Sequence, residues 1–250
     1  MNSHSTDSPI GEIIEAGTTA FVAQCLEVPR QITPKLYDPP PLGAFVKICK
    51  PQAAPPAPAP PQLGAGGDEE EDPFALPLGG GDAASAGTPL PAATYALVYG
   101  ANTASLEPNR RPSALGFADE DELRAQQPQI FELLRTEFSG LLVAYAPGDG
   151  KGLRRHLPPK PPRIHSWVYL CDADEVRALT ADLSFLRALL LPSGGALAGV
   201  PTDELVAACL RGARDAQVND QEFLLRAGKT LAALLTEDYD RLQAILRAVL

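Results

Sequence analysis

Hydrophobic and polar positions follow two different periods in this chain, one before residue 172 and another after it. In the first part, short apolar runs rich in β-branched and aromatic residues predict β-strands, whose side chains alternate between two faces. These runs are 11–25, 44–48, 95–106, 141–145 and 166–170. Gly17 interrupts the first run, which predicts a bulge or a bend within one strand.

The run 44–48 shows the alternation of a half-buried strand. Ala44, Val46 and Ile48 share one face, and Phe45 and Lys47 share the other. A further strand could pair at 153–157, inside the long loop that separates the runs at 141–145 and 166–170.

A helical period first occurs between the predicted strands. Asp119, with Glu122 three residues later, is a helix-start signal, and Pro128 predicts a second helical segment or a kink. Apolar residues at helical spacing predict the inward face of this inserted helix: Ile130, Phe131, Leu134 and Phe138.

After residue 172 the pattern predicts helices only. Asp172 and Glu175 form a capping-box pair, which predicts a helix with one apolar stripe. The stripe consists of Val176, Leu179, Leu183, Leu186 and Leu190. Thr202, Asn219 and Thr236 are predicted to begin three further helices, the last burying Leu242, Ile245, Leu246 and Val249.

A tract rich in proline, alanine and glycine occupies residues 51–92, between two predicted strands of one sheet. Such a composition favours extended conformations without internal hydrogen bonds. We expect a loop that leaves both strands in one small barrel. Its proline run is interpreted as a passive linker, with a PxxP-type groove ligand as the alternative.

Length and patterning together predict an α+β protein of one or two domains. The expected order is a disordered tail at 1–9, a small β-barrel at 10–171 and an all-helical C-terminal domain at 172–250. The barrel is interrupted by the tract at 51–92 and by a helix at about 119–138.

Charge and cysteine usage exclude some classes of protein. The net charge of −10 argues against a general binder of nucleic acid or anionic membrane. Cys25, Cys49, Cys171 and Cys209 are far apart, which favours buried thiols in a reducing compartment over a metal site. We find neither a secretory signal nor a membrane-spanning run, so we expect a cytoplasmic protein.

The predicted strands resemble the HAS-barrel, the small barrel shared by HerA-type DNA translocases and ATP synthase catalytic subunits. Gly11 opens the first strand, and Gly43, Val46, Lys47 and Ile48 match the second. Over roughly 10–50 and 94–250 the chain is similar to stand-alone bacterial HAS-barrel proteins, cyanobacterial ones among them. The resemblance implies a barrel that packs against partner subunits at the rim of an assembly.

The chain departs from the motor relatives in one respect. Its nearest approach to a phosphate-binding loop is Gly150-Lys151-Gly152, where Tyr145 replaces the first glycine and Gly152 replaces the Ser or Thr. Without that glycine and that hydroxyl, the loop lacks the groups that wrap a phosphate and bind Mg²⁺. We therefore expect no ATPase activity and no cofactor.

A basic segment at 151–163 is the main local charge anomaly. It contains five cations and no carboxylate, and Arg110 and Arg111 are expected beside it. The cations are Lys151, Arg154, Arg155, Lys160 and Arg163. They would bind an acidic or phosphate-bearing partner, or else pair internally with 119–122 or with the acidic run 68–72.

Candidate catalytic groups are not brought together by the pattern. His165, Trp167, Tyr169 and Cys171 share one face of a strand, so the imidazole and the thiol lie ~20 Å apart. They are too distant for a nucleophile–base pair, and we expect this strand to be buried between barrel and helices. No histidine cluster for a metal is present.

The sequence therefore predicts a non-catalytic interaction or assembly module that docks onto a protein partner, such as a motor or a nuclease. The alternative is an accessory binder of nucleic acid or another polyanion through 151–163. The partner and the oligomeric state are not predicted.

Overall fold

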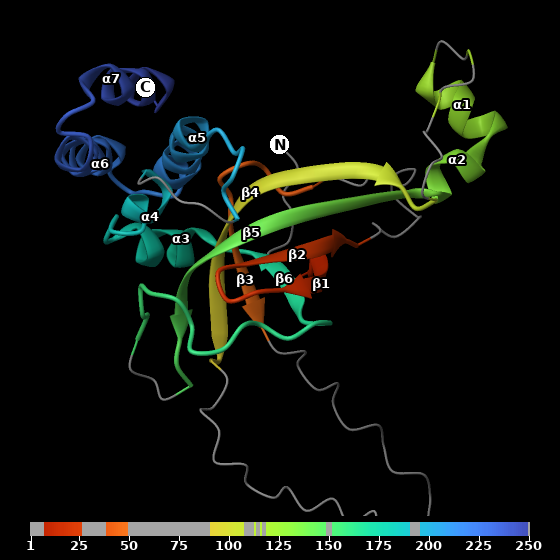
Figure 1. Cartoon of the computed structure of the whole chain (residues 1–250), viewed down its shortest axis with the longest axis horizontal. Coiled ribbons are helices and arrows are strands. Elements are labelled where there is room, and N and C mark those ends of the chain that lie inside the picture. Colours follow the sequence, from red (N-terminus) through yellow and green to blue (C-terminus); the bar gives the residue numbers. More distant parts are fainter. Residues whose placement is uncertain are drawn as a thin grey trace, which may run out of the picture.

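Six strands of the described part of the chain close into an antiparallel barrel in the order β1-β2-β5-β4-β3-β6 (Figure 1). The computed structural model describes residues 8–26, 39–49, 91–107, 113, 116, 119–148, 152–190 and 196–249. The strands are β1 Gly11–Ala16, β2 Ala20–Cys25, β3 Phe45–Cys49, β4 Ala93–Ser105, β5 Leu134–Ala146 and β6 Trp167–Leu170. The α+β class and the small barrel are thereby confirmed.

The first predicted strand is a hairpin instead of one bent strand. The chain turns at Gly17, whose N–H donates to the carbonyl of Ala20 at 2.8 Å, and β1 pairs with β2. A register shift does occur, but between Ile13 and Glu15. The prediction of a bulge or bend at Gly17 was wrong. Gly17 and the two threonines after it form a turn that reverses the chain, whereas a bulge would have let one strand continue.

The proline-rich tract lies in the chain between two strands that pair with each other, as predicted. Cys49 at the end of β3 is the cross-strand partner of Ala93 at the start of β4. Residues 50–90 lie outside the described residues, as do 1–7 of the predicted tail.

Small residues make room for two phenyl rings inside the barrel. Phe21 and Phe138 pack edge to face with their centroids 6.3 Å apart. A Cβ at Gly140 would lie 2.4 Å from the Phe21 ring, and one at Gly11 would lie 2.6 Å from Phe138. The interior is completed by Ile13, Ala23, Cys25, Val46, Ile48, Ala96, Val98, Leu142 and Val168.

Five helices cover the outer face of β3, β4 and β5 on one side of the barrel (Figure 1). They are α3 Ala173–Thr180, α4 Leu186–Leu190, α5 Thr202–Asp215, α6 Asp220–Leu234 and α7 Tyr239–Val249. Strand residues Phe45, Leu97, Leu141, Val143 and Ala144 join helix residues in one hydrophobic core. The strand 45–49 is therefore covered on both faces, whereas the alternation of its residues predicted that only one face would be buried.

The helix predicted from Asp172 is two helices. Its capping box is confirmed, with Asp172 and Glu175 bonding each other's backbone N–H. The stripe, however, continues from α3 to α4 across a turn in which the Asp182 carboxylate accepts from the N–H of Ser184 at 2.9 Å. Side chains of this kind compete with helical hydrogen bonding, so the turn replaces a continuous helix.

The last helix begins later than predicted. Thr236 does not cap it, because its hydroxyl donates back to the carbonyl of Ala233. The carboxylate of Asp238 accepts from the N–H of Arg241, as an N-cap does. Asn219 caps α6 as predicted, and α5 begins at Thr202.

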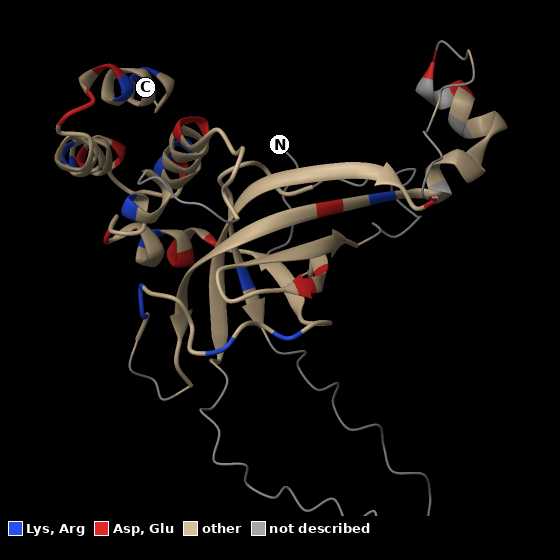
Figure 2. Ribbon diagram, in the orientation of Figure 1, with Lys and Arg blue, Asp and Glu red and all other residues tan. Residues whose placement is uncertain are grey.

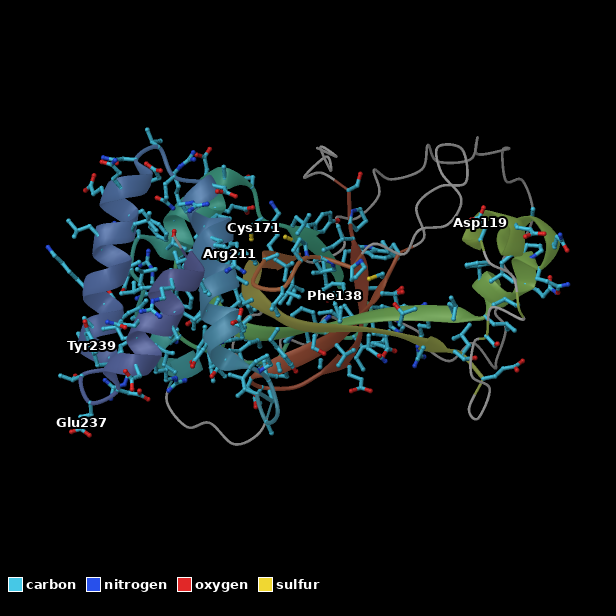
Figure 3. All side chains as sticks on the ribbon, turned by 90° about the horizontal axis from the view of Figure 1, so that it is seen from above. Asp119, Phe138, Cys171, Arg211, Glu237 and Tyr239 are labelled. Carbon is cyan, nitrogen blue, oxygen red and sulfur yellow. The ribbon has the colours of Figure 1, made fainter. Side chains whose placement is uncertain are left out.

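The hairpin of β4 and β5 extends beyond the barrel and carries two short helices, α1 Glu120–Gln126 and α2 Pro128–Glu132. Pro128 begins α2, as predicted, but that helix ends at Glu132. Leu134 and Phe138 therefore belong to β5, and the predicted helical face that contains them is wrong. Figure 3 shows Asp119 at the far tip and Phe138 in the barrel.

Candidate functional site

The basic segment forms a loop that leaves β5 at one end of the barrel and returns into β6. Arg154 makes an isolated antiparallel bridge with Tyr145, with backbone N···O distances of 2.8 and 2.9 Å. The ring of His156 packs on that of Tyr145 with centroids 5.2 Å apart. The predicted strand at 153–157 is thus reduced to a single bridge.

Arg155 fastens this loop to the helices. Its Nη2 donates to the carbonyl of Ala178 in α3 at 2.7 Å. Its Nε is buried and has no hydrogen-bond partner among the described residues. Because Arg155 is half-buried and bonded to α3, it is less available to a partner than its neighbour Arg154, which is exposed.

Arg154, Lys160 and Arg163 are exposed cations, and none of them forms an ion pair within the described ranges. These three cations therefore show no pairing with the described part of the acidic start of the inserted helix. Figure 2 shows why: the loop lies below the barrel, whereas α1 lies at the tip of the hairpin. The other predicted internal partner, the run 68–72, lies outside the described residues.

Three of the predicted site residues, Arg110, Arg111 and Lys151, also lie outside the described residues. Their described neighbours are far apart. Leu106 follows β4 at the tip of the long hairpin, whereas the basic loop follows Ala146 at its base, where β5 pairs with Ala93.

Arg163 also lines a cavity of about 340 Å³ at the mouth of the barrel. Ile48 and the prolines of the loop give this cavity apolar walls, and Thr94 and Ser166 add buried hydroxyl-bearing side chains. This volume is at the lower end of the range of small-molecule pockets in proteins. The sequence analysis did not predict it, because its walls come from strands and a loop that are distant in the chain.

A second feature that the sequence analysis missed joins the barrel to α3. Lys47 Nζ lies 3.0 Å from both carboxylate oxygens of Glu175, which also caps the helix. Cross-strand pairing places Tyr95 and Tyr169 on either side of Lys47. The Lys–Glu pair is half-buried, so a lysine that alternation places on a solvated face is instead fixed against the helices.

Burial controls the electrostatics around this pair. It raises the pKa of Tyr95 to about 12, with the Glu175 charge adding to the effect. It also raises the pKa values of the Cys49 and Cys171 thiols. Burial lowers the pKa of Lys47, but the hydrogen bond and charge of Glu175 outweigh it and leave that pKa raised. Both thiols are therefore protonated at neutral pH and are poor nucleophiles.

His165 precedes β6 and adopts a left-handed φ of 67°. Its Nδ1 lies 2.5 Å from Glu12 Oε1 on β1. The side chain is exposed, whereas Cys171 packs against the helical core, so the two do not form a dyad. In the neighbouring strand, Val168 and Leu170 face the barrel interior, and Cys171 after it packs against the helical core. Trp167 and Tyr169 are only half-buried, so the predicted burial between barrel and helices is met only in part.

The projecting part of the hairpin is a further candidate surface. We call it the arm: Ala101–Ser105 of β4, Leu134–Glu137 of β5 and helices α1 and α2. β3 pairs with β4 only as far as Leu97, and β2 pairs with β5 only from Glu137. Residues 101–104 are exposed.

No group of three metal-ligating side chains occurs within the part of the chain that the structure describes. Nor is any helix there both long enough and apolar enough to cross a membrane. No protein-family model matches the chain, and no curated protein matches it either.

Proposed function

We propose that the chain is a protein-interaction and assembly module built on a HAS-type barrel, and that the arm contacts its protein partner. The observation that carries this proposal is the extension of β4 and β5 beyond the strands that flank them. A two-stranded hairpin is only marginally stable alone in water. A projecting hairpin with two helices at its tip therefore adds little to the stability of the fold, but it provides a surface that a partner can contact.

Two further observations support a HAS-type barrel. The barrel is small, closed and antiparallel, as the resemblance implies. The matching residues Val46, Lys47 and Ile48 all lie in β3, where two of them fill the interior and Lys47 reaches α3. The partner implied by the resemblance is a subunit of a larger assembly, such as a motor or a nuclease.

The test compares partners captured from the native host by three forms of the protein. One is unchanged, one has residues 103–136 replaced by a two-residue turn, and one carries Arg154→Glu, Lys160→Glu and Arg163→Glu. We expect the unchanged form and the loop variant to recover the same partner and the arm deletion to lose it, with melting curves verifying that each form is folded. Retention of the partner by a folded arm deletion would refute the proposal.

The alternative function, binding of nucleic acid or another polyanion, is favoured by one observation: Arg154, Lys160 and Arg163 are exposed on one loop without a carboxylate partner among the described residues. For such binding, the logarithm of the binding constant falls linearly with the logarithm of the salt concentration, and the number of phosphates contacted sets the slope. The same triple reversal would abolish binding to single-stranded or duplex DNA if this function is correct. Salt-independent binding, or none at low salt, would exclude it.

A further inference from the structure

One edge of the arm presents backbone groups that pair with none of the described residues. Leu106 donates its N–H to the carbonyl of Leu133 at 2.7 Å, and the register continues from Ser105↔Leu134 to Ala101↔Phe138. In an antiparallel ladder only alternate residues bond to the neighbouring strand. The even-numbered residues therefore face β5, and the odd-numbered ones, Ala101, Thr103 and Ser105, direct N–H and C=O to the opposite side.

Two independent contacts support this alternation. The hydroxyl oxygens of Thr103 and Thr136 lie 2.9 Å apart, as expected for the close side chains of a non-hydrogen-bonded pair. On the outward side, Val98 makes the last bonds to the β3 side, with Gly43 and Ala44. Beyond Val98, no described residue pairs with this edge.

Beyond the register shift between Val98 and Gly100, the edge carries none of the side chains that keep a strand from pairing with other chains. Natural edge strands carry lysine, proline or inward-pointing charge for that purpose. Residues 100–105, Gly-Ala-Asn-Thr-Ala-Ser, are small and uncharged, and 101–104 are exposed. Their side chains leave the backbone accessible to another strand.

A second copy of the same edge fits this one in register. An antiparallel two-fold axis through Thr103 places Ala101 opposite Ser105 of the second copy and Thr103 opposite its own equivalent. Every outward-facing residue then meets an outward-facing residue, so each such pair exchanges two hydrogen bonds. A strand shifted by one residue would lose this match.

Charge on the adjoining strand agrees with that arrangement. Arg135 and Glu137 form an ion pair on the face shared by Ala104 and Asn102, their cross-strand partners. In the dimer, the axis places Ala104 opposite Asn102 of the second copy. A row of cross-strand neighbours then runs from Arg135 of one copy, through Ala104 and Asn102, to Glu137 of the other, and an equivalent row runs in the opposite sense. Opposite charges therefore lie at the ends of each row, and no like charges face each other across the axis.

We propose that two copies of this chain associate through the open edge of β4 at residues 101–105, forming one continuous sheet from both arms. The inference rests on the proposed role of the arm in assembly, and it names a second copy of this chain as the molecule that binds the edge of β4. A two-fold contact uses the edge on both chains and closes, so it gives dimers and not filaments. A ladder this short buries little area, which favours dissociation constants in the micromolar range.

The test measures the mass of the full chain by sedimentation across the micromolar range. We expect a concentration-dependent rise toward twice the mass of one chain. Thr103→Pro removes an outward N–H and no backbone bond within the arm, but it also removes the hydroxyl that contacts Thr136. It should weaken association at least about tenfold and should melt close to Thr103→Val, which loses the same hydroxyl. Thr103→Val retains that N–H and should still associate.

Cross-linking tests the register. Cα atoms of a hydrogen-bonded pair lie ~5.5 Å apart, within the range of a disulfide. Mild oxidation of Thr103→Cys should therefore yield a covalent dimer, whereas the unchanged chain and the matched control Val218→Cys, at an exposed position 92% accessible, should not.

A chain that remains monomeric throughout, or a Thr103→Pro variant that still dimerises, would overturn the inference. A thermal stability of Thr103→Pro well below that of Thr103→Val, with no dimer in the unchanged chain, would show that the edge is covered by the chain itself. In either case the capture experiment with the arm deletion still decides the proposed function, because it measures a different partner.

Discussion

At the scale of the residue, Gly43 shows how one backbone position joins the barrel to the helices. It has a φ of 77° in the turn before β3, where it approaches α5 so closely that a Cβ would lie 2.4 Å from the backbone nitrogen of Cys209. The position therefore requires glycine both for its conformation and for lack of space.

Gly43→Ala should lower the free energy of unfolding by about 1–3 kcal/mol or more, since backbone strain and a clash with α5 add together. The matched control is Gly212→Ala in α5, where a new Cβ meets no atom within 4 Å. That change should stabilise the protein by about 0.5–1 kcal/mol through helix propensity. Urea unfolding measures both, and equal effects would contradict this account of Gly43.

Tyr95 should make the stability of the protein depend on pH. Because burial raises its pKa from 10.0 to about 12, the folded state holds the phenolic proton more tightly than the unfolded state. The resulting stability is complete below pH 10 and is lost as the pH rises toward 12. Lys47, whose pKa is also raised, contributes with the same sign.

We expect the free energy of unfolding to fall between pH 10 and 12, by at most about 2 kcal/mol from Tyr95 because the side chain is only half-buried. Tyr95→Phe should show a shallower fall over the same range, and Tyr169→Phe on the other side of Lys47 is the control. Denaturant titrations at several pH values make the comparison. Identical slopes for the unchanged protein and Tyr95→Phe would disprove the assignment.

At the scale of the element, the pairing of Cys49 with Ala93 brings together the two ends of a long insertion. The hairpin of β3 and β4 therefore needs only a short turn to close. Replacing residues 52–90 with a few Gly and Ser residues should leave the melting temperature unchanged or raise it. Closing a loop of about 5 residues instead of 40 saves roughly 2 kcal/mol of chain entropy.

Calorimetry of that shortened chain measures the outcome. A matched control scrambles residues 52–90 without shortening them and should melt like the unchanged protein. A large drop in melting temperature for the shortened chain alone would show that the insertion contributes contacts to the barrel.

At the scale of the whole molecule, one hydrophobic core crosses the boundary between barrel and helices. Leu97 on β4 and Leu205 on α5 are both fully buried in it. A barrel without the helices would expose Phe45 and Leu97 to water. The two parts should therefore unfold together, whereas independent domains would unfold separately.

A single calorimetric transition is the expected result, with Leu97→Ala and Leu205→Ala each lowering its midpoint. Each should cost about 2–5 kcal/mol, as buried leucines do. Two transitions, of which Leu205→Ala shifts only one, would show that the helices form a separate domain.

Patterns local in the sequence predicted much of this structure. Apolar runs located the barrel strands except for the first half of β5, which had been predicted as helix. The capping residues Asp172 and Asn219 located helix starts, and composition identified the insertion between paired strands. These features depend on backbone geometry and neighbouring side chains, which a short window of sequence contains. The hairpin at Gly17 and the turn at Asp182 were missed, because turn residues competed with a continuous apolar pattern.

Only the tertiary structure determined what the outer surfaces do. Lys47 lies against Glu175 because α3 packs on β3. The loop of Arg154 lies away from α1 because α1 sits at the tip of the arm and the loop at the opposite end of the hairpin. The open edge of the arm follows from where β3 and β2 stop pairing with its strands. Contacts between residues distant in the chain depend on the register and closure of the barrel, which no local pattern of hydrophobicity encodes.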